Sequence, residues 1–107
     1  MGEEEWEQLQ DRFAGAPGVT LPGESARRGF GRHALKVDGS IFAMWVRGHL
    51  VVKLPQARVD ALVADGDAVR FDANKGTPMK EWAVIHVEDP AVWAALADEA
   101  LAFVRRR

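Results

Sequence analysis

The chain has 107 residues, no cysteine and a formal net charge of −2. Its length fits one domain over residues 1–107, and the lack of cysteine excludes disulfides, thiolate metal sites and cysteine nucleophiles. The acidic start at residues 3–5 lacks a signal-peptide pattern, and no apolar run approaches the roughly 20 residues of a membrane span. A cytoplasmic protein without a membrane partner is therefore expected.

The charges are segregated along the chain. Residues 1–24 carry a net charge of −5 and residues 59–107 a net charge of −3, whereas residues 25–58 carry +6. The basic residues of the middle segment are Arg27, Arg28, Arg32, Lys36, Arg47, Lys53 and Arg58. Such an asymmetry is typical of an anion-binding surface.

The first predicted element is an amphipathic helix. Trp6, Leu9 and Phe13 recur at helical spacing, which predicts a helix over residues 3–14. Its acidic first turn suits the helix dipole. Glycine and proline then predict a loop over residues 16–24.

A three-stranded antiparallel meander follows, over residues 33–54. Asp38-Gly39 is a two-residue hairpin signal, because a type I′ turn needs positive φ at both positions. A second turn at Arg47-Gly48 or Gly48-His49 leads into the third strand.

An unbroken pairing of these strands divides their residues between two faces. One predicted face holds Leu35, Val37, Phe42, Met44, Val46 and Val51 with His33, His49 and Lys53. The other holds Ala34, Ile41, Ala43, Trp45, Leu50, Val52 and Leu54 with Lys36 and Arg47. Both faces are largely apolar, so each is expected to be covered by helices of the chain or by a partner.

The remaining pattern completes an α+β domain centred on this meander. Pro55 suits the first turn of a helix over residues 55–64, and Asp89-Pro90 opens a last helix that runs to about residue 104. Strands are predicted at residues 69–71 and 80–87. The expected order is α-β-β-β-α-β-β-α, and a further strand at residues 27–30 is compatible with the pattern.

Motifs that would indicate catalysis are weak. The segment from Gly29 to Ala34 matches G-x-G-x-x-A, but a hairpin turn follows too soon for the helix that a dinucleotide site needs. The three histidines have no metal-ligand spacing, although His33 and His49 fall on one predicted face. No serine lies in a nucleophile motif. A protein without enzymatic activity, cofactor or metal is expected.

Two surfaces remain as candidates for binding. The basic residues at the entry to the meander and beyond it could neutralise phosphates, or could protect a sheet edge from pairing. The nucleic-acid-binding candidates are Arg27, Arg28, Arg32, Lys36, Arg47 and Lys53. Trp45 and Trp82 are either core residues or part of a dimer interface.

The order of several short motifs resembles the TfoX N-terminal domain family. The motifs are Phe30-Gly31, Leu35-Lys36-Val37-Asp38-Gly39-Ser40-Ile41-Phe42-Ala43, Leu50-Val51-Val52-Lys53-Leu54 and Lys75-Gly76-Thr77-Pro78-Met79. The sibling MmcQ/YjbR family is similar as well, and the resemblance covers about residues 25–104. Arg32 stands where the TfoX-type pattern commonly has a second glycine, which adds a cation.

The resemblance implies a small bacterial α+β module. One family is linked to competence regulation and the other to a proposed DNA-binding role, and neither offers catalytic residues to transfer. The chain leaves no room for the helical C-terminal domain of full-length TfoX-type regulators, so a competence role is not expected. Two hypotheses follow: a regulatory module that binds DNA through its basic segment, or a module that binds another protein or a second copy of itself.

Overall fold

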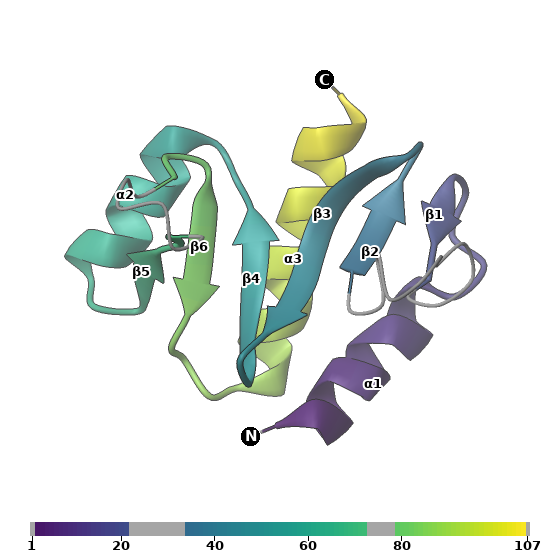
Figure 1. Cartoon of the computed structure of the whole chain (residues 1–107), viewed down its shortest axis with the longest axis horizontal. Helices are drawn as coiled ribbons and strands as arrows, with labels where there is room; N and C mark the ends of the chain where they lie inside the picture. The colour runs from purple at the N-terminus through teal and green to yellow at the C-terminus, as the bar shows by residue number, and fades with distance from the viewer. Residues whose placement is uncertain (1, 22–33, 73–78, 107) are drawn as a thin grey trace.

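The computed structural model describes residues 2–21, 34–72 and 79–106. These residues form three helices and a six-stranded antiparallel sheet, so the predicted α+β class is confirmed. The elements are α1 (Glu3–Phe13), β1 (Val19–Thr20), β2 (Ala34–Val37), β3 (Ser40–Val46), β4 (His49–Lys53), α2 (Gln56–Ala64), β5 (Ala68–Arg70), β6 (Trp82–Ile85) and α3 (Pro90–Arg105). Figure 1 shows α3 behind the sheet, α2 at the end of the sheet that carries β5, and α1 below β1 and β2.

The strand order is β1-β2-β3-β4-β6-β5. The meander β2-β3-β4 is as predicted, and β6 pairs with β4 on one side and with β5 on the other. β1 lies within the segment predicted as a loop, and it pairs with β2 through Val19 and Thr20. The strand considered at residues 27–30 lies outside the described residues.

Both hairpin turns have the backbone conformation that two-residue turns require. Asp38 has φ 50° and Gly39 has φ 87°, which confirms the turn predicted from the Asp-Gly pair. The second turn is formed by Arg47 with φ 52° and Gly48 with φ 79°. The left-handed region is uncommon for a residue other than glycine, asparagine or aspartate.

The predicted division of the meander into two faces is wrong for β2 and for Ile41 and Phe42 of β3, because the pairing of β2 with β3 contains a bulge. Leu35 pairs with Ala43, whereas Lys36 pairs with Ile41, so β3 has one extra residue, Phe42. An extra residue in one strand reverses which side chains share a face beyond it. Lys36 therefore lies on the same face as Lys53, and Leu35 lies with Ala43.

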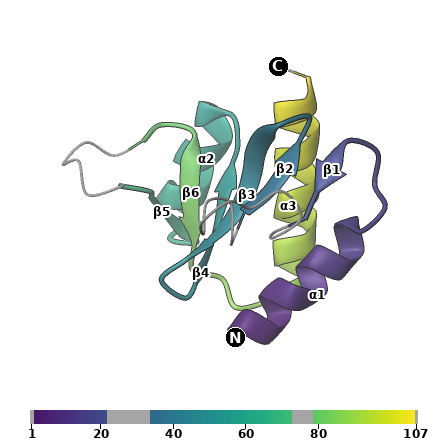
Figure 2. The same cartoon turned by 45° about the vertical axis from the view of Figure 1, so that its right-hand side comes forward.

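One face of the sheet packs against the helices and forms the core. Trp45 points into this face, with its ring centroid 6.0 Å from that of Trp6 on α1 and 5.8 Å from that of Trp93 on α3. Phe42 meets Phe13 of α1 edge to face. α1 lies beside the first half of α3 in the turned view (Figure 2). The chain's own helices therefore cover one of the two apolar faces.

α3 begins at a well-formed N-terminal cap. The Asp89 carboxylate accepts a hydrogen bond of 2.9 Å from the Ala91 N–H, and Pro90 occupies the first helical position, as the sequence predicts. In the described ranges, no helix is long and apolar enough to cross a membrane.

Candidate functional site

The face of the sheet turned away from the helices, called the outer face below, carries an apolar row across five strands. Strand pairing sets the residues of this row opposite one another from β5 to β2. The row consists of Val69, Val84, Val51, Met44 and Ala34. Val69, on the edge strand β5, is 46% exposed, whereas Val51 at the centre is fully buried.

Three of the predicted nucleic-acid-binding residues belong to this face or its rim. Lys36 on β2 and Lys53 on β4 lie at one end of the sheet. Arg47 lies at the opposite end, in the β3–β4 turn, where it lines a groove of about 300 Å³ together with residues of the outer face. Cations therefore stand at both ends of one face.

Three arginines on the helix side are held in ion pairs, whereas Arg105 of α3 donates to the Pro17 carbonyl. Arg12 of α1 lies 2.6 Å from Asp98 of α3, and Arg58 of α2 lies 2.9 Å from Glu99 of α3. Arg70 of β5 pairs with Asp60 of α2.

These ion pairs also change the pKa values of two of the guanidinium groups. The side-chain hydrogen bond to Asp98 raises the pKa of Arg12, and that to Glu99 raises the pKa of Arg58. The charges of these arginines are thus matched within the fold.

The cations of the outer face differ from these arginines in having no carboxylate partner. Across residues 2–21, 34–72 and 79–106, no ion pair involves Lys36, Arg47 or Lys53. Lys53 instead places its Nζ 5.5 Å from the centroid of the Trp82 ring, a cation–π contact. Their charge is available to a partner of opposite sign.

The other predicted site residues are placed as follows. Arg27, Arg28 and Arg32 lie outside the described residues. Trp45 is a core residue between two other tryptophans, whereas Trp82 lies on the outer face beside Lys53. Of the two tryptophans considered for an interface, Trp82 is the one that the fold presents on the outer face.

Comparison with known families agrees with the resemblance noted in the sequence. A sequence profile described as the TfoX N-terminal domain matches residues 20–104. The chain belongs to the TfoX N-terminal domain family. Neither the curated proteins nor the solved structures that were compared contain a match.

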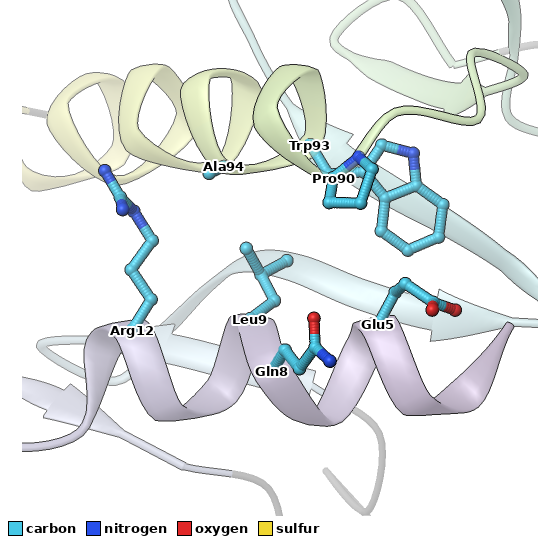
Figure 3. Close-up of a pocket in the computed structure, with 7 residues that line it drawn as sticks. All are labelled: Glu5, Gln8, Leu9, Arg12, Pro90, Trp93 and Ala94. Atoms are coloured by element: carbon cyan, nitrogen blue, oxygen red, sulfur yellow. The ribbon is translucent and has the colours of Figure 1, made fainter. Parts of the chain in front are cut away.

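This TfoX N-terminal domain also has a cleft on its helix side, between α1 and α3. The cleft has a volume of about 170 Å³ and is lined by Leu9, Arg12 and Trp93 among others (Figure 3). Its charged groups already have partners: Glu5 accepts a hydrogen bond from the Gly2 N–H, which lowers the pKa of Glu5, and Arg12 pairs with Asp98. The cleft offers no unmatched charge to a ligand.

The structure brings together two histidines that sequence reasoning did not pair. His49 on β4 lies next to His86, which follows β6, and their ring centroids are 5.4 Å apart. In the described part of this TfoX N-terminal domain, no group of three or more His, Asp or Glu residues is placed to hold a metal ion. The sequence placed His49 on one predicted face with His33, which lies outside the described residues. No local sequence pattern placed β6 beside β4, so the pair of His49 with His86 was missed.

Proposed function

We propose that this TfoX N-terminal domain is a regulatory binding module without enzymatic activity, and that it binds DNA through the outer face of its sheet. One observation carries the proposal. Arg12, Arg58 and Arg70 are ion-paired. Lys36, Arg47 and Lys53, which lie on the outer face or at its rim, have no carboxylate partner within the described ranges. The proposal also rests on the family membership and on the positive net charge of residues 25–58.

The positions of these cations suit a polyanion that runs along β4. The run from His49 to Lys53 covers about 13 Å at the rise of a β-strand. Arg47 lies beyond one end of it, and Lys36 and Lys53 lie at the other. Successive phosphates of a nucleic acid would be neutralised at both ends, and binding would release their counterions.

A salt-dependent titration with duplex DNA tests this proposal. Fluorescence anisotropy is measured for the natural chain and for the variant Lys36→Ala/Arg47→Ala/Lys53→Ala between low and moderate salt. The natural chain is expected to bind more weakly as salt rises. The variant should lose affinity and reduce the slope of log K against log salt by about 3, because each neutralised phosphate contributes about 0.9.

A matched variant controls for net charge. Arg12→Ala/Arg58→Ala/Arg105→Ala also removes three positive charges, but from arginines of the three helices. It should retain most of the affinity. An equal loss in both variants, or no binding by the natural chain at low salt, would refute the outer-face assignment. The variant Arg27→Ala/Arg28→Ala/Arg32→Ala tests the remaining predicted residues in the same assay.

A second candidate function is self-association through the outer face. It is favoured by the apolar row that ends in Val69, which is 46% exposed, and by Trp82 on the same face. Val51 and Ala34 of this row are buried, so Val69 is its exposed end. An exposed apolar residue with an aromatic residue on the same face is typical of protein interfaces.

Light scattering coupled to size exclusion tests for the dimer. A dimeric mass is expected for the natural chain, and Val69→Lys should shift it toward the monomer because it places a charge in the apolar row. Ala95→Lys adds the same charge to the exposed side of α3 and should leave the dimer intact. A constant mass of 11.8 kDa over a wide concentration range would exclude this candidate.

A further inference from the structure

His49 and His86 occupy a pair of positions whose side chains approach each other closely. β4 and β6 are antiparallel, with Val51 opposite Val84, so His49 falls opposite His86 in the same register. The Leu54 N–H donates to the Glu81 carbonyl, so Leu54 and Glu81 form a hydrogen-bonded pair. Hydrogen-bonded and non-hydrogen-bonded pairs alternate along an antiparallel ladder, and His49 with His86 lies five residues further along, so it is a non-hydrogen-bonded pair. Side chains are closest at non-hydrogen-bonded pairs. Both imidazoles are exposed to solvent.

The tautomer of His49 is suited to metal binding. Its Nδ1 lies 3.2 Å from the Arg47 carbonyl oxygen. Because a carbonyl accepts and cannot donate, this contact is a hydrogen bond when Nδ1 carries the proton, and Nε2 then keeps its lone pair. A ring whose other nitrogen donates to a backbone carbonyl is the usual arrangement of a histidine that binds a metal.

The separation of the rings matches that of two imidazoles on one ion. A metal–nitrogen bond of about 2.0–2.1 Å, extended by the radius of the ring, puts each centroid about 3.2 Å from the ion. A tetrahedral angle then separates the two centroids by about 5.2 Å. The observed separation is 5.4 Å, so the two rings already stand at the spacing that one shared ion requires.

We propose that His49 and His86 chelate a divalent transition-metal ion, of the class of Zn²⁺, Ni²⁺ or Cu²⁺. Imidazole nitrogen suits these ions, whereas Mg²⁺ and Ca²⁺ prefer oxygen ligands. The pair borders a hollow of about 250 Å³ that Glu88 also lines, which leaves space for water at the remaining coordination positions. His49 also lines the groove that contains Arg47, so the metal site adjoins the proposed DNA-binding face. The zinc titration below contains no DNA, so its outcome does not depend on the DNA-binding proposal.

Calorimetric titration of the chelator-treated full chain with ZnCl₂ at neutral pH tests the proposal. One zinc ion per chain is expected. His49→Ala and His86→Ala should each weaken binding by at least about tenfold, because the second coordination bond of a chelate forms at a high effective concentration. In nuclear magnetic resonance spectra, the imidazole signals of His49 and His86 should shift together as zinc is added.

Three controls make the outcome decisive. His33→Ala should bind zinc as the natural chain does, and MgCl₂ should give no heat of binding. Urea unfolding should show that the two variants keep their fold, since both side chains are exposed. Absence of zinc binding, binding unaffected by His49→Ala and His86→Ala, loss of binding in His33→Ala, or one zinc per two chains would each overturn the proposal.

Discussion

Arg47 has a backbone conformation that glycine and asparagine adopt more readily. Its φ of 52° places it in the left-handed region, in the first position of the β3–β4 turn. This region is unfavourable by about 1–2 kcal/mol for most L-residues, and asparagine is among the few that tolerate it. A residue that strains the backbone and exposes an unpaired cation is consistent with a binding role.

Replacement of Arg47 by asparagine should increase the stability of the fold and weaken its binding to DNA. Arg47→Asn is expected to raise the free energy of unfolding by about 0.5–1 kcal/mol, because it relieves the backbone strain, and to weaken DNA binding, because it removes a cation. Urea unfolding and anisotropy titration measure the two effects.

The matched control keeps the charge at this position. Arg47→Lys retains both the cation and the strain, so it should change neither quantity much. Equal stability of the Asn and Arg forms would show that the turn is not strained at this position.

At the scale of elements, the stability of α3 depends on the cap at its N-terminus. It supplies Trp93, Leu96 and Ala97 to the core, and it carries the partners of Arg12 and Arg58. Its start is defined by the hydrogen bond between the Asp89 carboxylate and the Ala91 N–H.

Removal of this cap should destabilise the whole domain. Asp89→Ala is expected to lower the free energy of unfolding by about 1 kcal/mol, as loss of an N-cap usually does. Asp89→Asn keeps a side-chain oxygen that can accept the same hydrogen bond, and it should lose much less. Urea denaturation curves compare the two, and equal losses would assign the effect to the charge instead of the cap.

The elements differ in how far the sequence predicts them. The helices and the first hairpin were predictable, because helical spacing and an Asp-Gly pair are local signals. β1 was not, since two residues are too few to show a period and they form a strand by pairing with β2. The bulge at Phe42 was not predictable either, because residues 41–46 are all apolar and no alternation of polar and apolar residues marks the extra one.

At the scale of the whole molecule, the sequence predicted which segment is basic but not which cations are free. An ion pair such as that of Arg12 with Asp98 forms only where two helices from distant parts of the chain pack together. The faces of Lys36 and Lys53 depend on the bulge. The neighbourhood of His49 and His86 depends on β6 lying beside β4, and no local pattern encodes the order of strands.

That strand order gives the sheet two kinds of contact: pairs of strands that are close in the sequence, and pairs that are far apart in it. β2, β3 and β4 are joined by two-residue turns, so the contacts between them close short loops. β6 also pairs with β4, but α2 and β5 lie between them in the sequence, so this contact closes a longer loop. Closing a longer loop costs more conformational entropy of the chain. The junction of β4 with β6 carries both the centre of the apolar row and the histidine pair. A fragment that ends after the meander would therefore lack the histidine pair, and it would keep only the part of the apolar row from Val51 to Ala34.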